Sequence, residues 1–141
     1  MRILVCGGRD YACAPGHKYY KGEQSKIEYQ FVFNTLNNIA EEFSKEYNEH
    51  DNWLPTDIVI IQGCAEGVDL AADDWSIVNY SQRDPYPADW NKHKKAAGSI
   101  RNQQMIDEGK PDLVVAFPGG PGTADMVRRA KKAGIPVREI A

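Results

Sequence analysis

The sequence lacks the marks of several protein classes. No apolar run approaches the roughly 18 residues of a membrane span, and the chain enters a strand-like segment at once, without the longer apolar region of a signal peptide. No internal repeat or low-complexity tract interrupts its 141 residues. We therefore expect a cytoplasmic protein with no membrane partner, folded as the single domain 1–141.

Cysteine and histidine are scarce, with three of each. Cys6, Cys13 and Cys64 form no CxxC pair, and the histidines lie far apart without the spacing of metal ligands. Cys6 and Cys64 follow two expected strands and could be neighbours. Reduced, inert thiols are favoured over reactive ones, and no metal site is expected.

An excess of positive charge is also missing. The formal net charge is −3 and the pI is about 5.6, so the chain as a whole does not attract a nucleic-acid backbone. Only the run 92–95, Lys-His-Lys-Lys, gathers positive charge locally. A solvent-facing patch is favoured for it over an anion site at a helix N-terminus. Nucleic acid is therefore disfavoured as a partner.

Three nucleotide and hydrolase motifs are absent as well. The sequence has no GxxxxGK[ST] loop, no GxSxG turn and no GxGxxG spacing. These absences exclude a P-loop NTPase and give no reason to expect a nicotinamide, a flavin or any other cofactor.

The sequence does contain a regular alternation of strand-like and helix-like segments. Apolar runs at 2–6, 57–62, 112–117 and 137–140 predict strands, the proline-containing segment 84–90 predicts a weak strand, and residues 25–47, 68–80, 94–108 and 123–133 predict helices. Residues 10–22 and 48–56 are expected to be loops. This order predicts an α/β fold, a Rossmann-like three-layer sandwich with a mainly parallel sheet of about five strands.

The expected first helix carries two specific signals. Ser25 and Glu28 have the spacing of a capping box, which would place the helix start at Ser25. Ile27 and Phe31 open an apolar stripe that continues toward Phe43 and predicts a buried face.

Three glycine turns follow the first, second and fourth expected strands. They are Gly7 to Asp10, Gly63 to Asp69, and Pro118 to Thr123. Because the carboxyl ends of parallel strands lie at one edge of a sheet, where such folds bind ligands, the three turns predict a single site.

The last turn, Pro-Gly-Gly-Pro-Gly-Thr, is the strongest signal. Its glycines leave main-chain N–H groups accessible to an anion, and a threonine hydroxyl and a helix N-terminus follow. It predicts a phosphate-binding loop.

Each charged residue near the turns has two possible roles, one in ligand binding and one in the fold or at the surface. Arg9 fits a phosphate and Asp10 a sugar hydroxyl, although a surface pair is favoured for them in isolation. Glu66 and Asp69 suit either a first helical turn or a sugar. Arg101 is either a solvated helix residue or a phosphate clamp.

The combined pattern resembles the YspA-like branch of the SLOG superfamily, which also includes the DprA/SMF proteins and the Lonely Guy phosphoribohydrolases. The resemblance rests on the first turn, the turn 63–69, the Ala-Asp-Trp at 88–90, Ala97-Gly98 with Arg101-Asn102 and Met105, and the glycine loop with Met126. It implies a Rossmann-like fold that binds nucleotides or nucleotide-derived ligands over the strand ends. It also implies a homo-oligomer, a dimer or larger.

The same resemblance defines the candidate residues and one departure. Lonely Guy enzymes carry the loop PGGxGTxxE, whose Glu acts with an arginine; here Arg101 is the counterpart of the arginine, but Met126 stands at the Glu position. The nearest carboxylate, Asp125, is one residue earlier and is expected to point elsewhere on the helix. The candidate ligand-binding residues are Gly7, Gly8, Arg9, Asp10, Gly63, Glu66, Gly67, Asp69, Arg101, Asn102, Pro118, Gly119, Gly120, Gly122 and Thr123.

The favoured function is binding of a nucleoside phosphate or an ADP-ribose-like molecule, as a sensor or a sequestering protein, with the phosphate on the glycine loop. The alternative is a phosphoribohydrolase acting on nucleoside 5′-monophosphates, with Arg101 and Asp125 as catalytic residues unless Asp10, Glu66 or Asp69 supplies the acid. Single-stranded nucleic-acid binding is a third, weaker alternative.

Overall fold

The computed structural model describes residues 1–47 and 57–141. The expected loop 48–56 lies outside these described residues.

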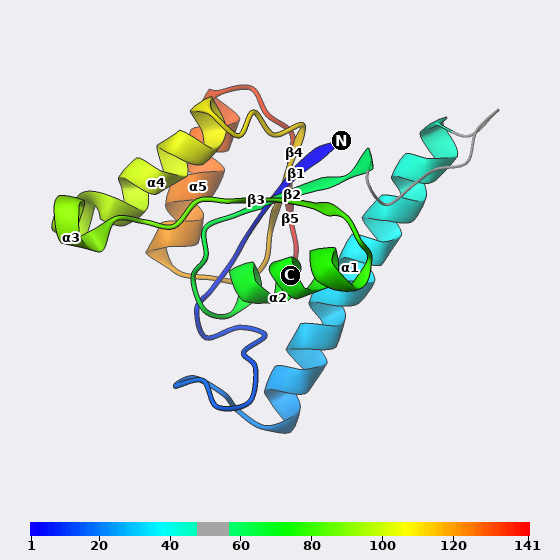
Figure 1. Ribbon diagram of the computed structural model, residues 1–141, viewed down its shortest axis with the longest axis horizontal. Helices are drawn as coiled ribbons and strands as arrows, with labels where there is room; N and C mark the ends of the chain where they lie inside the picture. Colours follow the sequence, from blue (N-terminus) through cyan, green and yellow to red (C-terminus); the bar gives the residue numbers. More distant parts are fainter. Residues whose placement is uncertain (48–56) are drawn as a thin grey trace.

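Within them, five parallel strands form one sheet in the order β3-β2-β1-β4-β5 (Figure 1). The strands are β1 (Arg2–Cys6), β2 (Val59–Gln62), β3 (Gln82–Pro85), β4 (Leu113–Ala116) and β5 (Val137–Glu139). The central strands β1 and β4 pair from Ile3 opposite Leu113 to Cys6 opposite Ala116. Side chains on both faces of these two strands are buried, which explains their unbroken apolar runs.

Helices cover both faces of the sheet. They are α1 (Glu23–Tyr47), α2 (Val68–Val78), the short α3 (Trp90–His93), α4 (Ala97–Asp107) and α5 (Pro121–Lys132). Ile3 and Val5 of β1 pack in one core with α1 and α2, while Leu4 and Cys6 pack in a second core with α4 and α5. This alternation gives the three layers seen in Figure 1, and the expected α/β Rossmann-like fold is confirmed.

The strand order reverses at β1. The chain sets β2 and then β3 outward on one side of β1, and afterwards places β4 on the other side. The crevice that such a reversal leaves at the carboxyl ends of the strands is the usual ligand site of this architecture. It lies where the chain leaves β1 and β4.

The expected start of the first helix is wrong. The helix begins at Glu23, two residues before Ser25, and both expected capping residues bind the preceding loop instead. The Ser25 hydroxyl accepts the Lys21 N–H at 2.8 Å, and Glu28 Oε1 accepts the Ala12 N–H at 3.1 Å. The Ser-x-x-Glu spacing is therefore used to fasten loop 10–22 to α1.

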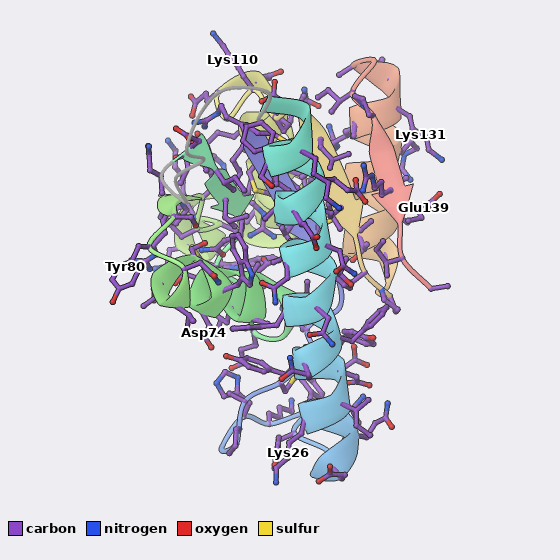
Figure 2. The ribbon with its side chains drawn as sticks, turned by 90° about the vertical axis from the view of Figure 1, so that its right-hand side faces the viewer. Lys26, Asp74, Tyr80, Lys110, Lys131 and Glu139 are labelled. Atoms are coloured by element: carbon purple, nitrogen blue, oxygen red, sulfur yellow. The ribbon has the colours of Figure 1, made fainter. Side chains whose placement is uncertain are left out.

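The expected buried stripe of this helix is also too long. Ile27 is 57% exposed and Phe31 lies at the margin of exposure. Figure 2 shows the reason: the first turns of α1, near Lys26, extend past the sheet, so no strand covers them. Among the apolar side chains of α1, burial begins at Val32, whereas the polar Ser25 and Glu28 are buried beneath loop 10–22.

The region around 84–108 differs from expectation in its boundaries. The weak strand lies earlier, at Gln82–Pro85, and it forms an edge of the sheet, where a proline removes no needed ladder bond. The expected helix 94–108 divides into a 3₁₀ turn (Lys94–Ala96) and α4. Lys94 has a positive φ of 53°, which separates α3 from the 3₁₀ turn.

Two composition-based expectations can be compared with the structure. All three cysteines are free; Cys6 and Cys13 are buried, but Cys64 is exposed. Among the described helices, none combines the length and the apolar character that crossing a membrane requires.

Candidate ligand-binding site

A pocket of about 640 Å³ opens at the reversal in strand order. Its walls come from the turn after β1, the start of α2, the segment from α3 into α4, and the start of α5. The lining residues are Cys6, Gly7, Gly8, Arg9, Asp10, Ala65, Asp69, Trp90, Lys95, Gly98, Ser99, Arg101, Asn102, Met105, Gly120, Pro121, Gly122, Thr123 and Asp125. This size suits a small organic ligand.

The turns after β1 and β4 are bonded to each other. The Gly8 N–H donates to the Pro118 carbonyl at 2.8 Å, and a Cβ on Gly119 would overlap the Thr123 hydroxyl and lie 2.8 Å from the Gly8 nitrogen. Pro118 and Gly119 therefore join two strands of the sheet. Neither lines the pocket.

The start of α5 is open toward the pocket. Gly120 occupies the N-cap position and no side chain caps the helix, so the N–H groups of its first turn have no side-chain partner. Cβ atoms added at Gly120 or Gly122 would meet nothing within 4 Å, and neither residue has a positive φ. The protein's own packing does not explain glycine at these two positions.

Arg101 reaches the pocket from α4. Its guanidinium donates from Nη1 to the Gly63 carbonyl and, through Nε, to Asn102 Oδ1 at 3.2 Å. Burial lowers the pKa of Arg101, and the negative charge of Asp69 opposes that shift. A Cβ on Gly63 would overlap the guanidinium, so a side chain there would require Arg101 to move. Arg101 is a positioned cation and not a solvated helix residue.

Asp69 is a buried acid in the pocket wall. It lies in the first turn of α2 and is 6% exposed, with Oδ2 accepting the Ala65 N–H at 3.2 Å. Burial raises the pKa of Asp69 to about 6, although the Ala65 N–H and the charges of Arg101 and Arg9 act against the rise. Burial likewise raises the pKa of the adjacent Cys6 thiol, so that thiol stays protonated.

Asp125 also lines the pocket, contrary to the expectation that it points elsewhere. Its carboxylate accepts hydrogen bonds from Asn102 at 2.9 Å and from Arg128 and Arg129 at 2.8 Å each. The Asn102 amide also donates to the Gly122 carbonyl at 3.1 Å. Asp125 thus holds Asn102 against the start of α5. Met126, one residue later, is buried in the core.

The structure brings ten of the sequence-derived candidates together in the pocket wall. These are Gly7, Gly8, Arg9, Asp10, Asp69, Arg101, Asn102, Gly120, Gly122 and Thr123. The other five do not line it: Gly63 contacts Arg101, Glu66 is exposed, Gly67 packs against the first turn, and Pro118 and Gly119 join the two turns.

Sequence reasoning did not assign four pocket residues in the segment from α3 into α4, which are Trp90, Lys95, Gly98 and Ser99. Trp90 lines the pocket, and the Arg9 guanidinium lies 5.3 Å from the centroid of its ring. Lys95 and Ser99 also line the pocket. Lys95 was visible only as part of a charged run. The break at Lys94 turns it toward the pocket, while Lys92 does not line it.

The chain has relatives among known proteins. The YspA, cpYpsA-related SLOG family matches residues 1–93. A relative, the Gene 61 protein of Mycobacterium phage D29, is 39% identical over 93 residues, which cover 59% of this chain and 71% of the phage protein. No solved structure matches the chain significantly. The family match contains the first two glycine turns and Trp90 and ends before Arg101 and the loop 118–123.

Proposed function

The chain belongs to the YspA, cpYpsA-related SLOG family, and on this premise we propose that its pocket binds a nucleoside phosphate or a related molecule such as ADP-ribose. Membership of the family suggests nucleotide-related ligands in general. The pocket residues support a more specific assignment of a phosphate end and a sugar end.

The phosphate is assigned to the start of α5. The observation that carries this assignment is the open space at Gly120 and Gly122, where the fold itself has no need of glycine. An anion placed there meets uncapped N–H groups and the positive end of the helix dipole. Arg101 and Lys95 line the same pocket and add positive charge.

The sugar is assigned to Asp69. Burying a carboxylate without a cation bonded to it is costly, and a buried acid with a raised pKa in a pocket wall is a candidate ligand-binding group. The pKa of Asp69 is raised because burial disfavours its ionised form. Ribose hydroxyl groups are suitable donors to its oxygens, and Asp10, at the pocket rim, offers a second acceptor.

The role that fits these groups best is sensing or sequestering a nucleotide. The proposed phosphate subsite combines main-chain N–H groups with the positive charges of Arg101 and Lys95, and all of these groups bind an anion without acting on it. A ligand at one hundred times its Kd adds about 2.7 kcal/mol to the free energy of unfolding, which a thermal-shift measurement detects readily.

The test is a thermal-shift and calorimetry panel. AMP, ADP, ADP-ribose and ribose 5-phosphate are compared with adenosine, which has no phosphate. We expect the phosphorylated compounds to raise Tm and adenosine to have little effect. If no phosphorylated compound raises Tm, the proposal is wrong.

One observation favours a second candidate, phosphoribohydrolase activity. Asp69 supplies a pocket carboxylate close enough to Arg101 for each to shift the other's pKa, whereas the oxygens of Asp125 already accept three donors. In this reaction the N-glycosidic bond breaks, water adds to the sugar carbon, and the base leaves with a proton, while a carboxylate stabilises the cationic sugar.

The second candidate is tested by chromatography of free base released from AMP. If the activity exists, Asp69→Asn and Arg101→Ala abolish release, whereas Arg138→Ala, an exposed arginine paired with Glu42, retains it. Release that is no faster in the wild type than in Arg101→Ala would remove this candidate and leave the binding proposal intact.

A further inference from the structure

Trp90 is an aromatic side chain held at the surface. It is 46% exposed, whereas Trp75 is 1% exposed in the core. Its backbone is fixed, because α3 begins at Trp90 and Asp89 accepts the Lys92 N–H at 3.1 Å as the N-cap. The edge of its ring lies against α4, where a Cβ on Gly98 would come within 3.5 Å of it. The indole is therefore anchored on one side and accessible on another.

The accessible side is turned toward the pocket. The Arg9 guanidinium, which comes from the turn after β1, lies 5.3 Å from the ring centroid, and both residues line the pocket. The cation lies over the ring, so this face of the indole is not covered by the protein core. Arg9 is exposed, so it has room to move aside or to cover a second flat group from above.

Different parts of the pocket wall offer different chemical groups. The start of α5 offers main-chain N–H groups and open space at Gly120 and Gly122, while Trp90 offers an aromatic face. Arg101 and Asp69 also line the wall. A ligand with an anion, a sugar and a flat ring has one group for each of these features.

We propose that Trp90 is the platform on which the aromatic ring of the ligand stacks, so that the site selects a base by the area of its face. This inference rests on the proposed binding of a phosphorylated ligand in the same pocket. Stacking on an aromatic side chain tolerates every base, because each has a flat face. Purines, with two fused rings, overlap the indole more than pyrimidines do, and the expected order of affinity is AMP, then CMP, then ribose 5-phosphate.

The experiment is calorimetric titration of these three compounds into wild type, Trp90→Ala and Trp90→Phe. Loss of one stacked base weakens binding by about tenfold. We expect Trp90→Ala to lower the affinity for AMP by about that factor and to leave the affinity for ribose 5-phosphate unchanged. Trp90→Phe should keep most of the affinity for AMP. Tyr80→Ala is the matched control, because Tyr80 is an exposed aromatic outside the pocket; Figure 2 shows it beside α2.

Three results would overturn the platform. They are equal affinities of wild type for AMP and ribose 5-phosphate, equal weakening of both compounds by Trp90→Ala, or equal losses in Trp90→Phe and Trp90→Ala. The first two leave phosphate binding in place. Binding of none of the three compounds would reject the platform, and if ADP and ADP-ribose also fail to raise Tm, the proposed function is rejected with it.

A fluorescence measurement covers the case in which Trp90→Ala fails to fold. Bound AMP is expected to quench tryptophan emission in the wild type and to leave it unchanged in Trp90→Phe. Equal quenching in both proteins would contradict the inference.

Discussion

The starts of α2 and α5 have similar sequence features but different surroundings. Each follows a glycine turn at the carboxyl end of a strand, and neither has a side-chain cap. At α2 the turn after β1 fills the space: a Cβ on Gly67 would overlap the Gly8 carbonyl, which also accepts the Val68 N–H at 3.3 Å. At α5 the space beside Gly120 is open. One helix start is filled by the fold itself, and the other is open toward the pocket.

The acids near these two starts differ in the same way. Burial raises the pKa of Asp69 to about 6, and no hydrogen bond from a cation compensates for it among the described residues. Burial also acts to raise the pKa of Asp125, but hydrogen bonds from Arg129 and Asn102 outweigh it and hold the pKa below its ordinary value. The carboxylate of Asp125 is therefore bonded within the structure, whereas that of Asp69 is buried in the pocket wall without a bonded cation among the described residues.

The largest expected effect is the loss of stability caused by substituting Gly67. Its φ is +81°, and an added Cβ would meet backbone atoms that cannot move aside. Gly67→Ala should lower the free energy of unfolding by about 3 kcal/mol or more. Urea unfolding measures the loss. A loss below about 1 kcal/mol would mean that the start of α2 is not packed as described.

Asp69→Asn should raise the free energy of unfolding, by less than Gly67→Ala lowers it. A pKa that rises from 3.8 to about 6 on folding means that ionisation destabilises the fold; this penalty is absent below pH 3.8 and complete above pH 6. The amide removes the ionisation, so we expect Asp69→Asn to be about 2 kcal/mol more stable than the wild type at pH 8.

The same measurement repeated at pH 4 supplies the control. There the difference between Asp69→Asn and the wild type should shrink toward zero. Asp125→Asn should instead be destabilised at pH 8, because it loses bonds from Arg128 and Arg129. A variant of Asp69 that is less stable than the wild type at pH 8 would refute the contrast between the two acids.

The smallest expected effect is on Lys95. It lines the pocket but is exposed, so its attraction for a phosphate is screened by solvent and salt. Lys95→Ala should weaken AMP about threefold at low salt and less at high salt. Lys92→Ala, a neighbouring exposed lysine outside the pocket, should have no such effect. Identical behaviour of the two variants would show that only general charge is involved.

Much of the fold follows from local patterns in the sequence. The apolar runs, the glycine turns and their alternation with helical stripes determine the element order, and parallel strands then bring the turns to one edge. The exact ends of the helices and strands were harder to predict from the sequence. Whether Ser25 caps a helix or binds Lys21 depends on where loop 10–22 lies, and that is a tertiary contact.

The site was predictable in position but not in the role of each glycine. Gly67, Gly119 and Gly122 read alike in sequence, yet only the neighbours that the fold supplies show that the first two are packed and the third is open. Trp90 and Lys95 both line the pocket, but neither the short helix that begins at Trp90 nor the break at Lys94 has a signature in the apolar pattern.

The open start of α5 is tested most directly by Gly122→Ala, measured for both stability and AMP binding. Apart from its chain neighbours and the backbone of its own helix, the added methyl group meets no atom within 4 Å, and Gly122 lines the pocket where the anion is expected. We predict a free energy of unfolding within about 0.5 kcal/mol of the wild type and a loss of AMP affinity of about tenfold or more. Unchanged affinity in this stable variant would contradict the claim that a phosphate binds at the start of α5.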